Sequence, residues 1–123
     1  MARKYKHLGA RLRLVLGPDI AIGPGKVDLL EQVQNTGSIA EAGRTLGMSY
    51  KRAWQLISTM NDAFKEPVVV TSRGGASKGG ATLTAFGEDL LERYRRIQAE
   101  TEQTVRADLD HLTAQLANGA DEA

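Results

Sequence analysis

The segment from Thr36 to Asn61 constrains the fold more than any other part of the chain. Ser38 precedes a short run of small and apolar residues, Gly47 follows that run, and Ser49 opens a longer stretch with apolar residues at helical spacing. Serine is a preferred residue at the start of a helix, and glycine often follows its end. The spacing predicts two helices joined by a tight turn, which is the helix-turn-helix arrangement.

The first predicted helix of this pair has a recognisable start, and the second has a distinct apolar side. In the first, Glu41 stands three residues after Ser38 and completes a capping-box pattern. In the second, the residues expected to share one buried face are Ala53, Ile57, Met60 and Phe64. No aspartate or glutamate occurs between Arg44 and Asp62, although a solvated helix usually mixes charges of both signs. The outer face of the second helix is therefore expected to be free of acids.

The flanking segments predict two small hairpins. Residues 11–16 alternate polar and apolar side chains, and residues 20–22 can return as a second strand after a Gly-Pro-Asp turn. A helix is expected to open at Gly23-Pro24-Gly25 and to end at Asn35-Thr36-Gly37. After the helix pair, residues 67–71 are β-branched and are followed by a basic, glycine-rich loop and a returning strand over 81–83. This second hairpin is expected to form the wing of a winged helix.

The last third of the chain predicts a long amphipathic helix. Thr84 is its expected cap, and apolar residues recur at three- and four-residue steps as far as residue 117, with a weaker stretch at Thr101 and Thr104. At 1.5 Å per residue, such a helix would be about 45 Å long. It exceeds what so small a domain can cover, so residues 84–117 are expected to pair with a second copy. The tail, residues 118–123, is polar and is expected to be disordered.

Composition and charge narrow the class of function. The chain has no cysteine and two well-separated histidines, and no nucleophile, base and orienting group converge, so neither an enzyme nor a bound cofactor or metal is expected. The glycine-rich loop lacks the spacing of a phosphate-binding loop in nucleotide enzymes. Residues 1–83 carry 12 lysines and arginines against 6 acids, whereas residues 84–123 carry 4 against 9. The first part, with its basic N-terminal arm, suits a polyanion.

These features together predict a surface for double-stranded DNA. Lysine and arginine neutralise phosphates, a capping serine and the free amides of a helix start can hold one phosphate, and glutamine and arginine reach base edges. Trp54 is expected to pack in the core. For Tyr50, the sequence favours core packing and phosphate contact equally. The residues expected to contact DNA are Ser38, Ser49, Tyr50, Lys51, Arg52, Gln55, Ser58, Arg73 and Lys78.

Nearly the whole chain resembles a known family. The stretches GSIAEAGRTLGMSYKRAWQLISTMN and GGASKGGATLTAFGEDLLERY are similar to the N-terminal domain of ModE-type, molybdate-responsive transcriptional regulators. The stretch SIAEAGRTLGMS is more distantly similar to LysR-type regulators. The resemblance implies a homodimer that reads a palindromic operator, is located in the cytoplasm with the nucleoid, and is linked to molybdenum metabolism. ModE regulators continue into molybdate-binding domains, so a chain that ends at Ala123 is expected to be a short form or a fragment.

Two alternatives remain open at this level. One is a winged-helix module that binds other proteins and not DNA. The other is a sensor that binds an oxyanion or another small molecule at its dimer interface. No apolar run reaches the roughly 18 residues that a membrane-spanning helix requires, so no membrane partner is expected.

Overall fold

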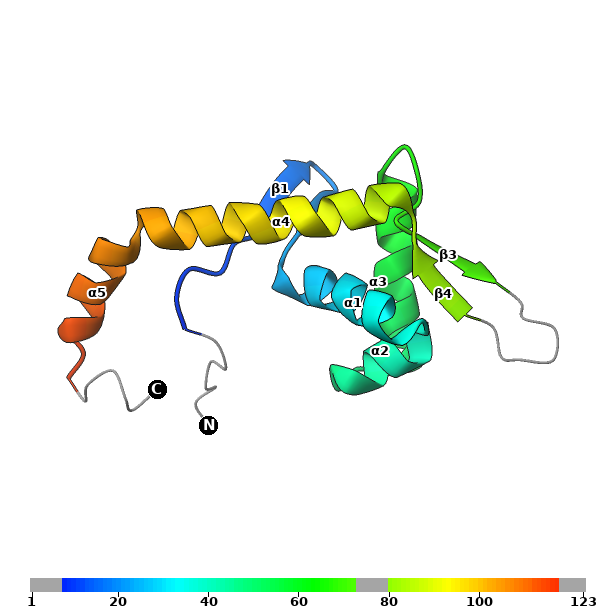
Figure 1. Ribbon diagram of the computed structural model, residues 1–123, viewed down its shortest axis with the longest axis horizontal. Coiled ribbons are helices and arrows are strands. Elements are labelled where there is room, and N and C mark those ends of the chain that lie inside the picture. The colour runs from blue at the N-terminus through cyan, green and yellow to red at the C-terminus, as the bar shows by residue number, and fades with distance from the viewer. Residues whose placement is uncertain (1–7, 73–79, 118–123) are drawn as a thin grey trace.

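Five helices and two antiparallel hairpins make up the part of the chain that the computed structural model describes, residues 8–72 and 80–117 (Figure 1). The elements are β1 (Leu14–Gly17), β2 (Ile20–Ile22), α1 (Pro24–Thr36), α2 (Ile39–Thr45), α3 (Tyr50–Ala63), β3 (Val69–Ser72), β4 (Gly80–Leu83), α4 (Ala85–Thr104) and α5 (Arg106–Ala114). This order confirms the predicted mainly helical, winged helix-turn-helix class with a small β content.

The N-terminal hairpin forms where it was predicted but starts later. β1 and β2 pair antiparallel, with Leu14 opposite Ile22, whereas the first strand was expected from residue 11. The carbonyl of Leu12 instead accepts a hydrogen bond from the Tyr94 hydroxyl of α4, at 2.6 Å. The segment before β1 is therefore bound to α4 and not to a neighbouring strand.

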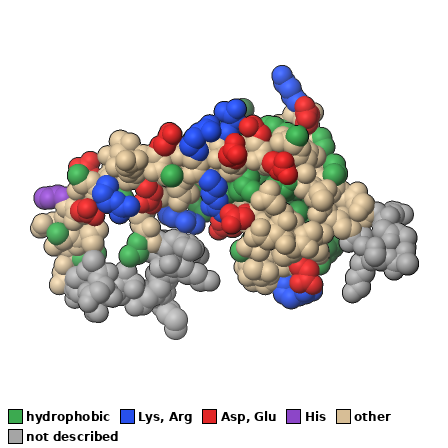
Figure 2. Space-filling view, viewed as in Figure 1, with side chains coloured by type: hydrophobic (Ala, Val, Ile, Leu, Met, Phe, Trp, Pro, Cys, Tyr) green, Lys and Arg blue, Asp and Glu red, His purple; other side chains and the backbone are tan. Residues whose placement is uncertain are grey.

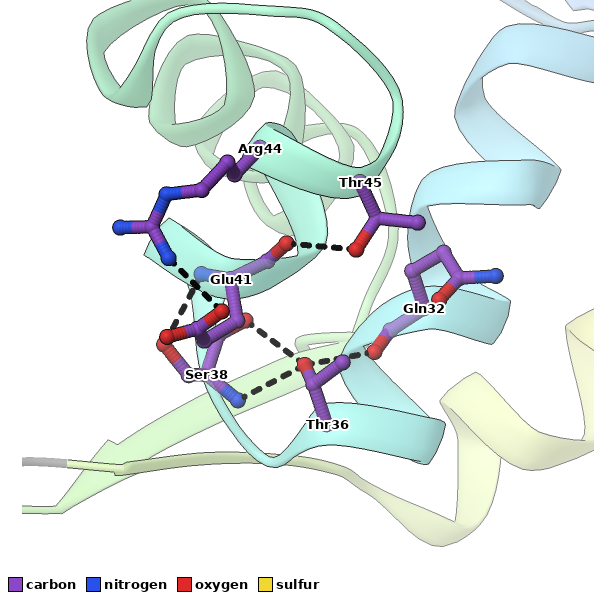
Figure 3. Close-up of polar contacts among 6 residues, drawn as sticks. All are labelled: Gln32, Thr36, Ser38, Glu41, Arg44 and Thr45. Atoms are coloured by element: carbon purple, nitrogen blue, oxygen red, sulfur yellow. Dashed lines mark hydrogen bonds and ion pairs between the residues drawn. The ribbon is translucent and has the colours of Figure 1, made fainter.

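The junction between α1 and α2 is held by short polar side chains (Figure 3). Thr36 Oγ1 donates to the carbonyl of Gln32 at 2.7 Å and accepts from the backbone N–H of Ser38 at 3.2 Å. Ser38 Oγ accepts from the N–H of Glu41 at 3.1 Å, as the capping prediction requires. The Glu41 carboxylate, however, pairs with Arg44 at 2.7 Å. Only half of the predicted capping box forms, because Thr36 already satisfies the Ser38 N–H.

The turn between α2 and α3 depends on two glycines. Gly47 has φ of 73°, a left-handed conformation that glycine adopts without a steric penalty. A Cβ on Gly43 would lie 3.1 Å from the Ala53 Cβ, so α2 and α3 cross closely there. Ser49 then caps α3, with its Oγ accepting from the N–H of Arg52 at 3.0 Å. The local geometry thus fixes α3 across α2.

The core lies where α1, α3 and α4 meet. The predicted face of α3 is confirmed, because Ala53, Ile57 and Met60 are fully buried. Phe64 is only partly buried and packs edge-on against Phe86, with ring centroids 5.1 Å apart. Full burial of a large aliphatic side chain contributes roughly 1.5–3 kcal/mol, so this core is the main source of stability. The fully buried side chains with the largest volumes are Tyr94, Ile22, Leu29, Leu30, Ile57, Met60, Val27, Val33 and Val68.

The wing is joined to the end of α3 by Asn61. β3 and β4 pair antiparallel, with Val69 opposite Leu83. The Asn61 amide donates to the Val69 carbonyl at 3.1 Å, and its Oδ1 accepts from the N–H groups of Val68 and Val69 at 2.8 and 3.3 Å. Asn61 therefore fixes the base of the hairpin to the end of α3 by three hydrogen bonds.

We expect Asn61→Ala to lower the free energy of unfolding by about 2–3 kcal/mol, because it leaves buried backbone groups of Val68 and Val69 without partners. Urea denaturation would measure the change. The matched control is Asn35→Ala, at an exposed position near the end of α1, where we expect a change within about 0.5 kcal/mol. Equal effects of the two substitutions would contradict the role assigned to Asn61.

The C-terminal helix differs from the continuous one expected over residues 84–117. It is interrupted at Val105, whose φ and ψ of −99° and 8° separate α4 from α5, and Figure 1 shows the sharp change of direction. Thr104 Oγ1 donates to the Glu100 carbonyl at 2.9 Å, a side-chain bond that bends helices. Two threonines and a valine within five residues, Thr101, Thr104 and Val105, further lower helix propensity there.

Candidate nucleic-acid interface

The outer face of α3 is exposed as the sequence predicted. Lys51, Arg52 and Gln55 are exposed, and Ser58 is half-buried beside them. These side chains lie on the helix surface opposite the buried Ala53, Ile57 and Met60. From Lys51 to Ser58 this exposed face offers several hydrogen-bond donors and no carboxylate. The expectation of an acid-free face does not hold for the last turn of α3, where Asp62 is exposed on the same side.

The two predicted cap serines lie at helix starts and keep a free donor. Ser38 Oγ and Ser49 Oγ each accept a backbone N–H bond as N-caps of α2 and α3. A serine hydroxyl can donate its own hydrogen while it accepts. Both hydroxyls can therefore donate to a phosphate oxygen without losing their capping role.

The cations of α3 are placed against local stability. Lys51 and Arg52 lie in the first turn of α3, which contains no acid. Positive charge near a helix N-terminus opposes the helix dipole, an effect of about 0.3–1 kcal/mol per charge. Because Lys51 and Arg52 destabilise the helix at these positions, their presence points to a role other than folding.

The acids of the domain are concentrated elsewhere. Over α4, Figure 2 shows acidic and basic side chains intermingled. There Arg95 pairs with Asp28 at 3.1 Å and with Glu31. Burial alone would lower the pKa of Arg95, but the hydrogen bonds to these two carboxylates outweigh it and raise that pKa. The α1 carboxylates are thus neutralised on the α4 side, and the face of α3 from Lys51 to Ser58 stays positive.

Trp54 corrects one expectation. It was expected in the core, but its side chain is 43% exposed, and that of Tyr50 is 59% exposed. Both line an open depression of about 340 Å³ between α3, the start of α2 at Ser38 and the wing strands. Trp54 lies on the side of α3 that faces the wing, and β3 and β4 cover only part of that side. We call this space the wing-side depression.

The structure brings most of the predicted contact residues to one surface. Ser38 and Tyr50 line the wing-side depression, and Ser49 caps the adjoining start of α3. Arg73 and Lys78, the predicted wing cations, lie outside the described residues. The wing strands themselves present Thr71 and Ser72 to the same depression.

Sequence reasoning missed a second set of cations beside α3. Arg13 and Lys26 line a depression together with Arg52, although they are far from it in the sequence. No spacing pattern reports this proximity, because it depends on how the N-terminal hairpin packs against α1 and α3. The only available signal was the surplus of basic residues before residue 84.

Residues 8–72 and 80–117 contain no group of three histidine, cysteine, aspartate or glutamate side chains that could hold a metal ion. Within the same ranges, no helix combines the length and apolar character needed to cross a bilayer.

Comparison with known proteins identifies the family. Residues 25–88 match the model of the bacterial regulatory helix-turn-helix proteins of the LysR family. The transcriptional regulator ModE of Yersinia pestis is 38% identical over 112 residues, which cover 86% of this chain and 43% of that protein. The molybdenum transport protein ModE of Azotobacter vinelandii is 36% identical over 107 residues, covering 87% of this chain and 38% of that protein.

A third relative has a different name. The molybdenum-pterin-binding protein MopB of Rhodobacter capsulatus is 44% identical over 78 residues, covering 63% of this chain and 29% of that protein. The chain thus spans about two-fifths of the length of the two ModE relatives and less of MopB. These matches confirm both resemblances found in the sequence, to ModE regulators and to LysR-type regulators. The chain belongs to the LysR-type family of bacterial helix-turn-helix regulators, a family of DNA-binding transcription regulators and not of enzymes.

Proposed function

We propose that this chain is a sequence-specific transcriptional regulator that binds double-stranded DNA as a homodimer. The observation that carries the proposal is the outer face of α3 from Lys51 to Ser58, which contains no acid and exposes Lys51, Arg52 and Gln55 next to the wing. An α-helix of this kind fits the major groove of B-form DNA. The two cations at the start of α3 destabilise that helix in the free protein, and a bound polyanion would offset this effect.

Each part of the surface has a distinct role in this proposal. Arg52 and Gln55 reach base edges, where arginine pairs well with guanine and glutamine with adenine. Lys51, Ser49 and Ser38 contact phosphates, which fix register and orientation. Tyr50 and Ser58 border these contacts. Arg73 and Lys78 of the wing loop contact the adjacent backbone or minor groove.

The C-terminal helices support dimerisation. The side chains of Ile97, Leu112 and Leu116 are 37%, 63% and 54% exposed, and α5 buries none of its residues. In a homodimer paired through residues 84–117, these apolar side chains would leave water. Two recognition helices would then read half-sites about 34 Å apart, or a multiple of that distance, so the operator would be palindromic.

We further propose that the regulated genes concern molybdenum. Relatives of this chain carry ModE and molybdenum in their names, and the similarity covers the DNA-binding part. Such a regulator acts in the cytoplasm, on the nucleoid. Selecting bound sites from a random DNA pool gives the operator and its symmetry, and locating that operator in the genome tests the molybdenum link. An operator found away from every molybdenum gene would refute that link but not DNA binding.

Lys51→Ala is expected to weaken binding to all duplexes and to lower the slope of log affinity against log salt by about one unit. Fluorescence anisotropy between 50 and 200 mM salt measures both quantities. The matched control is Lys65→Ala, which removes an exposed cation just after α3. An unchanged slope for Lys51→Ala would remove this residue from the interface. A wild-type chain without salt-dependent retention of any duplex would overturn the proposed function itself.

A further inference from the structure

Three cations from separate parts of the chain gather beside α3, on the flank away from the wing. Arg13 precedes β1, Lys26 lies in the first turn of α1, and Arg52 lies in the first turn of α3. Together they line one open depression of about 460 Å³. We call these three side chains the hairpin-side cluster.

Structured parts of the chain hold the hairpin-side cluster in place. The Lys26 ammonium donates to the Ala21 carbonyl of β2 at 2.8 Å, which leaves two of its three hydrogens free. The stem of Arg13 lies over Gly23, with its Cγ 3.8 Å from the position that a Cβ would take there. The N-terminal hairpin and the start of α1 therefore determine where both charges stand.

The cluster lacks a neutralising partner around its depression. The residues that line it include no aspartate or glutamate. The pKa of Lys26 is lowered, first by burial and then by the nearby guanidinium groups of Arg13 and Arg52. Like charges held together in this way repel one another, and a bound anion would remove that repulsion.

The placement of the cluster on α3 relates it to the two walls of a DNA groove. Residues two apart in a helix lie roughly 160° apart around its axis, so Arg52 and Trp54 flank opposite sides of α3. An α-helix with its side chains is about 10–12 Å wide, and the major groove is about 12 Å wide. A helix in the groove therefore has one phosphate backbone on each flank.

We propose that the hairpin-side cluster binds phosphates of the DNA backbone that lies across the major groove from the wing. The inference rests on the proposed function and adds a second binding surface to it. Arg13 and Lys26 contact phosphates of one backbone that borders the groove, and the wing contacts the other backbone. In this arrangement Arg52 lies between Lys26 and the base pairs. Its guanidinium is therefore within reach of both a phosphate and a base edge. Contacts on both walls fix the angle of α3, which contacts on one wall alone leave free to roll.

The test is the salt dependence of DNA binding by the double variant Arg13→Gln, Lys26→Gln. Each lost phosphate contact lowers the slope by about 0.9 units, so the rise in Kd between 50 and 200 mM salt shrinks by about 12-fold. The matched control is Arg44→Gln, Lys65→Gln, which removes the same charge from exposed positions on α2 and just after α3. We expect the control to keep a slope close to that of the wild type.

The outcomes separate the inference from the function beneath it. If the wild-type chain shows no salt-dependent binding to DNA, the proposed function is refuted. A wild-type chain that binds, together with a double variant whose slope equals that of the control, sinks the hairpin-side cluster alone. Lys26→Gln also removes the bond to Ala21, so thermal unfolding of each variant is measured in parallel. If the double variant is unfolded, Arg13→Gln alone decides, with a slope lowered by about one unit or not at all.

Discussion

The double variant Lys51→Glu, Arg52→Glu is expected to lose at least about 100-fold in DNA affinity, or about 2.7 kcal/mol, while its fold becomes no less stable. The loss follows because two attractive contacts with a polyanion become repulsive. Stability is kept because acids in the first turn of a helix are favoured by its dipole. The carboxylate introduced at position 52 would in addition face Arg13 and Lys26, the two cations that now crowd the native Arg52.

The matched control for this variant is Arg44→Glu, Lys65→Glu, which changes the net charge by the same amount at exposed positions away from the outer face of α3. We expect this control to bind DNA with an affinity within about tenfold of the wild type at 0.15 M salt, where charges beyond about 8 Å are screened. Anisotropy gives the affinities and thermal unfolding gives the stabilities. Equal losses of affinity in the two variants would mean that net charge matters and the α3 face does not.

Gly87→Ala is expected to lower the free energy of unfolding by about 3 kcal/mol or more. A Cβ on Gly87 would overlap the Val68 carbonyl oxygen and lie 3.0 Å from the carbonyl carbon. That oxygen cannot withdraw easily, because it accepts from the Thr84 N–H at 3.0 Å and the Val68 N–H is bound to Asn61. The gain in helix propensity from alanine is at most about 1 kcal/mol, so the clash decides the sign.

Gly25→Ala provides the opposite case within the same chain. Gly25 lies in α1, and an added Cβ would meet nothing within 4 Å. We expect this variant to be as stable as the wild type or up to about 1 kcal/mol more stable, because alanine is the better helix former. Chemical denaturation of both variants checks the pair. Similar effects of the two substitutions would contradict the close approach between α4 and the backbone of Val68, just before β3.

Features set by local sequence were predictable, and features set by distant contacts were not. Ser38, Ser49 and Thr84 each cap the helix that the sequence assigned to them, because a cap depends only on the next three residues. Gly37 and Gly47 end their segments with positive φ for the same local reason. Periodicity likewise identified the buried face of α3.

The structure differs from the sequence-based predictions where packing against another element determines the position of a residue. Trp54 is exposed because the short wing strands leave its side of α3 partly open, which no helical wheel reports. Arg13 and Lys26 join Arg52 only through the packing of the hairpin, and Leu12 leaves the strand because Tyr94 takes its carbonyl. In the candidate site, the sequence therefore predicted the outer face of α3 and contacts on its wing side, but not the exposure of Trp54 or the hairpin-side cluster.

The interruption at Val105 has a mechanical consequence. An unbroken helix over residues 84–117 would carry a twist applied at its far end directly to the core around Tyr94. The straight segment instead covers only α4, which is about 30 Å long at 1.5 Å per residue. The bend at Val105 turns α5 away from the axis of α4, so a force on α5 acts at an angle to α4 and not along its axis.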